Sequence, residues 1–204
     1  MTFADFIPNV PTAALFLSAV AIIVSCFTLW FTVLRRGKVC STRPSIIGLR
    51  HDTVAMKAGE LKPPQATIFI RTLLFSTGKR GQVVESLFLR VHEGSRQVEF
   101  SCWSHGDKDL IRGSGLFVPE TGVATNHHFS PTDSEALFPF SPGSISLELV
   151  AKLVSSERLV SLWMVTLEVP DGVFRKHVFD EKEIFYSWSP EQRAYAASIE
   201  NRSG

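Results

Sequence analysis

The sequence has no lysine or arginine before residue 35, and Asp5 is the only charged side chain in that stretch. A secretory signal peptide needs a basic region ahead of a short apolar segment. That basic region is missing here, and the apolar run that follows is longer than a signal peptide requires. Both features argue against a cleaved leader.

The chain is also poor in cysteine and in net charge. Its three cysteines, Cys26, Cys40 and Cys102, lack the paired spacing of a metal-binding motif, and such sparse usage fits a reducing cytoplasm. With 21 basic and 20 acidic side chains the formal net charge is +1. No long basic stripe appears beyond a cluster near residue 35, so we expect no nucleic-acid partner.

Motifs that carry nucleotide or acyl-transfer chemistry are missing as well. The stretch from Gly78 to Gly81 lacks the P-loop spacing and its Lys-Ser/Thr ending. Ser114 is flanked by glycines but lacks the full G-x-S-x-G pattern. Cys102 is expected on the apolar face of a strand, where a thiol packs in the core rather than acting as a nucleophile. The sequence therefore predicts no catalysis and no cofactor.

What the sequence does contain is an uncharged apolar run over residues 11–34, PTAALFLSAVAIIVSCFTLWFTVL. A helix rises about 1.5 Å per residue, so this run can cross a hydrocarbon core of about 30 Å. We expect a transmembrane helix here, after a short tail at residues 1–10. Small residues four apart, Ala14 with Ser18 and Ala21 with Ser25, predict a homo-oligomer or another helix as a partner in the bilayer.

Charge placement predicts the orientation of that helix. Arg35, Arg36 and Lys38 follow the apolar run directly, and basic residues beside a span stay on the cytoplasmic side. The N-terminus is then outside and the rest of the chain is cytoplasmic. In the opposite orientation, Cys40 and Cys102 could form a disulfide, and residues 201–203 would be a glycosylation sequon.

The remaining sequence predicts a basic connector at residues 35–45, one all-β domain at 46–188 and a polar tail at 189–204. No internal repeat and no amphipathic helical pattern follows the apolar run. Strands are expected near residues 46–56, 66–75, 82–91, 97–103, 115–118, 123–129, 144–154, 159–169, 176–179 and 183–188, with one more strand or a short helix at 195–199. Short strands with turns at roughly ten-residue spacing predict an antiparallel β-sandwich.

Alternation within two strands predicts which side chains face the core. Leu87, Leu89 and Val91 share one face of the strand at 82–91. The odd-numbered side chains of the strand at 159–169 share another. One buried face and one solvated face are typical of antiparallel sheets.

Two stretches, LLFSTGKRGQVVESLFLRV and FPFSPGSISLELVAKLV, resemble the turn-linked strands of membrane-anchored immunoglobulin-like or fibronectin-type accessory domains. The resemblance covers most of residues 46–188 and implies a binding or assembly role. The resemblance implies no active site, and the Cys-Trp-Cys spacing of antibody-type domains is absent.

The irregular middle segment holds the best candidates for chemistry. His105, Asp107 and Asp109 alternate, so an extended strand would point them the same way, and His127 and His128 follow later. Histidine and carboxylate side chains bind metals or transfer protons. The competing interpretation is that these residues are turn formers with no second ligand motif.

Phe138-Pro139-Phe140 is the candidate for a partner-binding site. Proline is excluded from central strands, so the two phenylalanines are expected on an edge or loop where they could receive a partner. Our leading hypothesis is a single-pass membrane protein with a cytoplasmic β-sandwich that binds or scaffolds a protein. The alternatives are a membrane-tethered metal-dependent hydrolase that uses residues 105–128 and an extracytoplasmic adhesion-like module.

Overall fold

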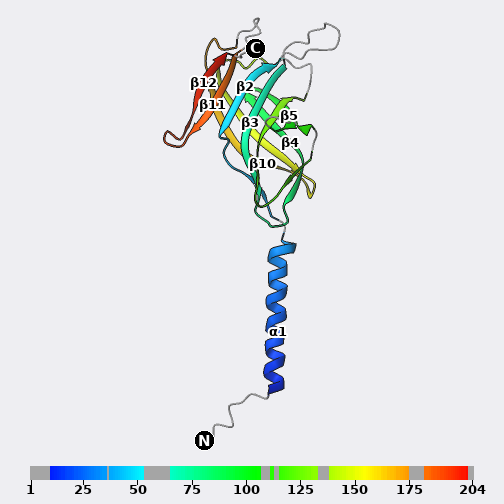
Figure 1. Cartoon of the computed structure of the whole chain (residues 1–204). Helices are drawn as coiled ribbons and strands as arrows, with labels where there is room; N and C mark the ends of the chain where they lie inside the picture. Colours follow the sequence, from blue (N-terminus) through cyan, green and yellow to red (C-terminus); the bar gives the residue numbers. More distant parts are fainter. Residues whose placement is uncertain are drawn as a thin grey trace.

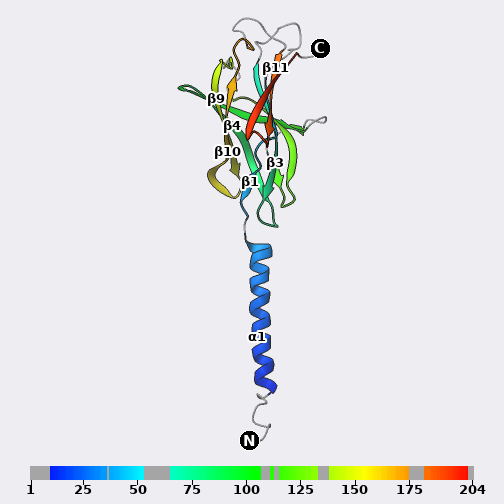
Figure 2. The same cartoon turned by 90° about the vertical axis from the view of Figure 1, so that its left-hand side faces the viewer.

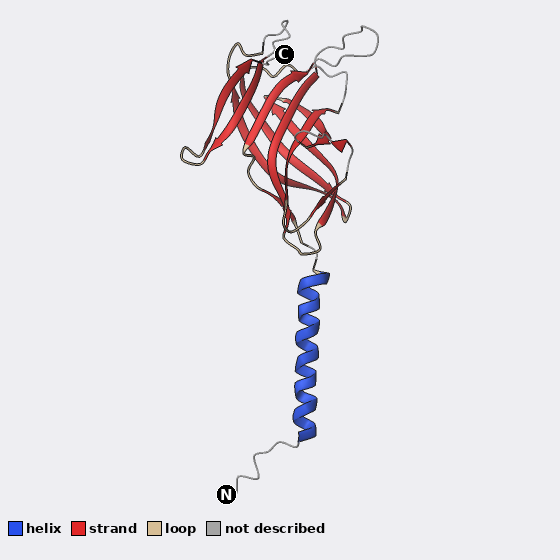
Figure 3. Ribbon diagram, in the orientation of Figure 1, coloured by secondary structure: helices blue, strands red, loops and turns tan. Residues whose placement is uncertain are grey.

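A computed structural model describes residues 10–35, 37–52, 65–106, 111–112, 115–132, 138–174 and 182–201. It has two parts, an N-terminal helix and a β domain (Figure 3). Helix α1 (Val10–Leu29) continues into the π-helical turn η2 (Trp30–Leu34), where the Arg35 amide donates to the Trp30 carbonyl at 2.8 Å. Arg36, Asp107 and Asp109 lie outside the described residues, as does the expected strand at 176–179.

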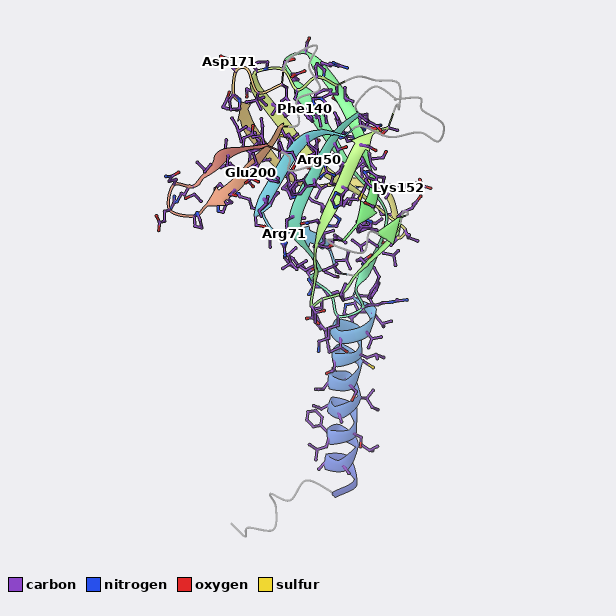
Figure 4. All side chains as sticks on the ribbon, turned by 45° about the horizontal axis from the view of Figure 1, so that its top comes forward. Arg50, Arg71, Phe140, Lys152, Asp171 and Glu200 are labelled. Atoms are coloured by element: carbon purple, nitrogen blue, oxygen red, sulfur yellow. The ribbon has the colours of Figure 1, made fainter. Side chains whose placement is uncertain are left out.

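The helical segment Thr12–Leu34 is long and apolar enough to cross a membrane, with a mean hydropathy of 2.3 and none of it buried in the protein. Length and composition alone fit a signal sequence equally well. Figure 4 shows the side chains of this helix projecting on all sides. Its polar hydroxyls are satisfied within the helix, since Ser18 donates to the Ala14 carbonyl at 2.9 Å and Ser25 to the Ala21 carbonyl at 2.8 Å. Such back-bonding leaves these hydroxyls without a need for water.

The described residues of the β domain form twelve strands, all paired antiparallel. They are β1 (Val39–Ser41), β2 (Ile46–Asp52), β3 (Gln65–Ser76), β4 (Gln82–Glu93), β5 (Arg96–His105), β6 (Ile111–Arg112), β7 (Leu116–Val118), β8 (Val123–Pro131), β9 (Gly143–Leu153), β10 (Ser156–Val169), β11 (Lys182–Ser189) and β12 (Ala194–Asn201). The predicted all-β, antiparallel class is confirmed.

The strands form one continuous sheet in the order β10-β9-β4-β5-β8-β3-β2-β11-β12, with β1, β6 and β7 paired off this path. The sheet curls around its own concave face, as the two views in Figures 1 and 2 show. Buried side chains from all the long strands except β12 meet inside the curl. A single hydrogen-bonded sheet therefore encloses the core, where the sequence predicted a sandwich.

The expected strands that lie within the described residues are present in order, and the faces of β4 follow the alternation. Leu87, Leu89 and Val91 are buried, as expected, and Phe88 and Arg90 between them are half-buried. The sheet also reaches beyond the expected limits of 46–188. It recruits β1 from the connector and β12 from the polar tail, because both segments supply backbone groups to neighbouring strands.

Strand β10 departs from the expected alternation because it contains a bulge. Its register against β9 shifts between Ser161 and Trp163. An extra residue at a bulge reverses which side chains face inward. Val160 and Leu162 therefore pack against the core, while Leu159, expected on the buried face, is 48% exposed.

The connector after the helix is fastened to the β3–β4 turn. The Lys38 amide donates to Thr77 Oγ1 at 2.8 Å, and the Thr77 amide donates to the Lys38 carbonyl at 2.9 Å. Gln82 Nε2 donates to the Gly37 carbonyl at 3.1 Å. A Cβ on Gly37 would overlap the backbone of Gly78, so the close approach of these two segments requires glycine.

Candidate functional site

The pairing of β5 with β8 brings together three side chains of the kinds that can bind a metal, Cys102, His105 and His127. His105 lies directly opposite His127 in the register. Residues three apart on a regular strand point to opposite faces, but the register shifts between Cys102 and Ser104. This irregularity turns Cys102 and His105 to the same side.

The three side chains are in close contact. Nδ1 of His105 lies 2.8 Å from Nδ1 of His127, and Cys102 Sγ lies 3.5 Å from His105 Nδ1. One ligand atom from each residue falls within 4.8 Å of the others. His127 is fully buried and its Nε2 has no hydrogen-bond partner among the described residues, whereas Cys102 and His105 are half-buried.

Burial keeps all three groups neutral near pH 7. It lowers the pKa of His127 to about 3, with smaller contributions from His105 and His128, and it lowers the pKa of His105 as well. Burial raises the pKa of the Cys102 thiol to about 12, although hydrogen bonds with the backbone lower it by a smaller amount. Neutral imidazoles offer lone pairs to a metal, but a protonated thiol is a poor nucleophile.

The sequence predicted only part of this cluster. It named His105 and His127 but assigned Cys102 to the core. His128, named as a ligand, points to the other face, as an adjacent strand residue must. Its Nε2 lies 3.2 Å from the Gly106 carbonyl, and its ring lies 6.0 Å from the ring of Trp103.

A cavity of about 310 Å³ opens beside the cluster and has Cys102 and His105 in its wall. Strands β4, β5 and β7 supply most of the lining. Glu99 is the only carboxylate among the residues described as lining it, and its Oε1 accepts a hydrogen bond from Arg90 Nε at 3.2 Å. Water or a small solute reaches two of the three side chains from this cavity.

Phe138 and Phe140 do not form the exposed pair that the sequence predicted. Both are buried, and their rings pack edge-on at 5.2 Å. The Phe138 carbonyl lies 2.9 Å from His51 Nε2, which ties this segment to β2. Figure 4 shows Phe140 within the β domain. The flanking proline keeps the segment out of the sheet but does not prevent it from capping the core.

A second region of interest is the groove between β10 and the β11–β12 hairpin, with a volume of about 500 Å³. We call it the β10 groove. Its lining residues are Arg43, Met164, Val165, Thr166, Leu167, Glu168, Tyr186, Trp188, Arg193, Ala194, Tyr195 and Ala197. The hairpin stands out from the side of the sheet (Figure 1).

Aromatic side chains form a fixed wall of the β10 groove. The rings of Trp188 and Tyr195 meet edge-on at 5.1 Å, and the Arg43 guanidinium lies 4.0 Å from the centre of the Trp188 ring. Tyr195 Oη donates to the Pro44 carbonyl at 2.8 Å. Trp, Tyr and Arg are the residues most enriched at binding hot spots.

The other wall of the β10 groove is a sheet edge. Among the described strands, β10 and β12 stand at the two ends of the order, so each pairs with a single neighbour. Tyr186 Oη donates to the Glu168 carbonyl at 2.9 Å and thereby links β11 to one end of β10. Burial raises the pKa of Tyr186 to about 12, with a contribution from Glu168.

Sequence reasoning missed the β10 groove because its parts lie far apart in the chain. The one signal for β10 was the run LVSLWMVTL over residues 159–167, which has no charge, proline or glycine. No known protein-family model matches the chain, and no curated protein matches it either.

Proposed function

We propose that this is a single-pass membrane protein whose cytoplasmic β domain, without catalysis, binds an extended segment of a partner protein in the β10 groove. The observation that carries this proposal is the free edge of β10 facing an aromatic wall. The proposed role is of the kind implied by the resemblance to immunoglobulin-like accessory domains.

The exposure of α1 supports the membrane span. Leu15, Phe16 and Ile22 are more than half exposed, although they are large and apolar. A helix that is apolar on all sides and packs on nothing would be unfavourable in water. A lipid bilayer as the partner of this helix accounts for both properties.

The placement of basic residues supports a cytoplasmic β domain. Arg35 and Lys38 flank the end of the helix, and hydrogen bonds fasten Lys38 to Thr77, next to Lys79 and Arg80 in the β3–β4 turn. Two segments that are distant in sequence therefore contribute positive charge beside the helix end. Anionic lipids of the cytoplasmic leaflet attract such clusters by about 1 kcal/mol per basic side chain.

The composition of β10 supports a binding role for its edge. Soluble proteins protect free edges with lysine, proline, short strands or bulges. In β10 this protection is confined to two register shifts, between Ser156 and Leu159 and between Ser161 and Trp163, and the strand beyond them is regular from Trp163 to Val169. Met164, 64% exposed, and Thr166 lie on this regular part. An added strand would gain backbone hydrogen bonds there and side-chain contacts from the facing aromatic wall.

The test uses the full chain in lipid nanodiscs, panned against a displayed library of random peptides. We expect enriched peptides to slow hydrogen exchange at those amides of residues 164–167 that point away from β9. Met164→Lys should weaken their binding roughly tenfold or more, because a charge then occupies the groove. Leu159→Lys is the matched control, since Leu159 is exposed on the same strand but lies outside the groove.

Two results would contradict the proposal. One is a library that yields no binder or yields binders whose affinity Met164→Lys leaves unchanged. The other is a dimer of this chain that pairs through β10, detected as a concentration-dependent mass that Met164→Lys abolishes. Either result would mean that the β10 groove does not bind an extended segment of a partner protein.

We do not propose the alternative of a metal-dependent hydrolase. Such an enzyme needs a general base beside the metal-bound water. Of the residues described as lining the cavity, only Glu99 is a carboxylate, and it is engaged by Arg90. The adhesion-like alternative needs the opposite orientation, in which Cys40 and Cys102 could form a disulfide. All three cysteines are free in the structure.

A further inference from the structure

We propose that Cys102, His105 and His127 bind a thiophilic transition-metal ion of the Zn(II) type, a function beyond the capture of a protein segment. The three side chains come from two paired strands and are held by the register of β5 against β8. A site on paired strands is more rigid than one on loops.

The distances fit tetrahedral coordination after a small movement. Bonds of about 2.0 Å to nitrogen and about 2.3 Å to sulfur place sulfur about 3.5 Å from each nitrogen, and the two nitrogens about 3.3 Å apart. Cys102 Sγ and His105 Nδ1 are already 3.5 Å apart, and the two histidine nitrogens are 2.8 Å apart. The imidazoles must therefore separate by about 0.5 Å, and Cys102 Sγ, which lies within 4.8 Å of the His127 ligand atom, must end about 3.5 Å from it. His105 can make this movement because it is only half-buried.

The ligand atom of His127 is its Nδ1. The side chain is 0% exposed, and its Nδ1 lies 2.8 Å from His105 Nδ1, so the two nitrogens that would bind the metal already face each other inside the protein. The Nε2 of His127 has no hydrogen-bond partner among the described residues, and it stays unpaired when Nδ1 binds the metal. The proposal therefore rests on the two facing Nδ1 atoms and the adjacent thiol of Cys102.

The donor set selects the ion. One thiolate and two imidazoles suit zinc, cobalt and copper and disfavour magnesium and calcium, which prefer oxygen. When the metal binds, the sulfur–hydrogen bond of Cys102 breaks, its proton leaves to solvent, and the sulfur electron pair forms the metal bond. Each imidazole contributes a nitrogen lone pair and keeps one proton on its other nitrogen. The cavity beside Cys102 and His105 gives water access to a fourth position.

The test is Co(II) titration of the full chain in detergent, because tetrahedral cobalt bound to a thiolate absorbs visible light strongly and shows a sulfur-to-cobalt charge-transfer band. We expect one cobalt per chain, displaced by Zn(II). Cys102→Ser should abolish the charge-transfer band. His105→Gln should weaken binding by at least the roughly 10–100-fold typical for loss of a supporting residue.

Matched controls are Cys40→Ser, which removes a half-buried cysteine on β1, and His92→Gln, which removes a half-buried histidine on β4. Neither residue belongs to the cluster, and both variants should bind cobalt like the parent. Circular dichroism of Cys102→Ser separates loss of the site from loss of the fold. A folded Cys102→Ser that keeps the charge-transfer band, or a parent that shows no band, would overturn the proposal. Peptide binding in the β10 groove is measured separately and does not decide this outcome.

Discussion

Replacement of Phe138 by alanine decides whether this side chain belongs to the core or to a binding surface. Phe138 is 1% exposed and its ring meets Phe100 edge-on at 5.5 Å and Phe140 at 5.2 Å. The Arg96 guanidinium lies 5.1 Å from the centre of the same ring. Truncation removes these contacts and leaves a cavity among aromatic rings that cannot easily collapse.

The expected cost of Phe138→Ala is about 3–5 kcal/mol in the free energy of unfolding. A domain of this size has a total stability of about 5–15 kcal/mol, so the variant loses at least about a fifth of it. The cost includes about 0.5–1.5 kcal/mol for each lost edge-on ring pair.

The measurement is urea unfolding of the full chain in detergent micelles, followed by tryptophan fluorescence. Phe117→Ala is the matched control, because Phe117 is 56% exposed, and its cost should stay within about 0.5 kcal/mol. A loss below about 1 kcal/mol for Phe138→Ala would refute the burial of this ring. It would restore the interpretation of Phe138 as a surface anchor.

Three further predictions concern other parts of the chain. Tyr186→Phe should make stability less sensitive to alkali, because above pH 10 the unfolded phenol of Tyr186 ionises while the folded one, with its pKa raised to about 12, stays neutral. Tyr195, whose pKa is also raised to about 12, contributes to the parent and the variant alike, so the parent should lose roughly 1 kcal/mol more than the variant by pH 11 in denaturant titrations, and equal losses would contradict this. Gly48→Ala should cost about 1–3 kcal/mol in the same assay, because a Cβ there would overlap the ring of Phe69, and an unchanged midpoint would contradict that packing. Cys40, which is half-buried, should react with a membrane-impermeant thiol reagent only after cells are lysed, and labelling of intact cells would reverse the proposed orientation.

Local patterns determined most of the secondary structure. The period of two in residues 82–91 predicted β4 and its buried face, because a strand with one side in the core must alternate. The uncharged run at 11–34 predicted α1 for an equally local reason, since every residue in it is compatible with an apolar helix. These features depend on near neighbours in the chain, so the sequence contains them directly.

Bulges and distant pairings could not be predicted in the same way. The bulge near Ser161 exchanges the faces of β10, and the irregularity between Cys102 and Ser104 places Cys102 beside His105. Neither has a marker such as glycine or proline, because each arises from the fit of one strand to its neighbour. Phe138 illustrates the same limit: its proline neighbour indicated a loop, but only the assembled sheet shows that the loop caps the core.

The sequence by itself thus determined an apolar helix with basic residues at its C-terminal end, an antiparallel β domain, and two of the three candidate metal ligands. The tertiary structure alone decided that Cys102 completes the cluster, that Phe138 and Phe140 are buried, and that β10 presents its free edge to the β11–β12 hairpin. The physical reason is that helix length and strand alternation are set by residues close in the chain. Strand order and register are set by the packing of the whole curled sheet, which joins residues more than a hundred positions apart.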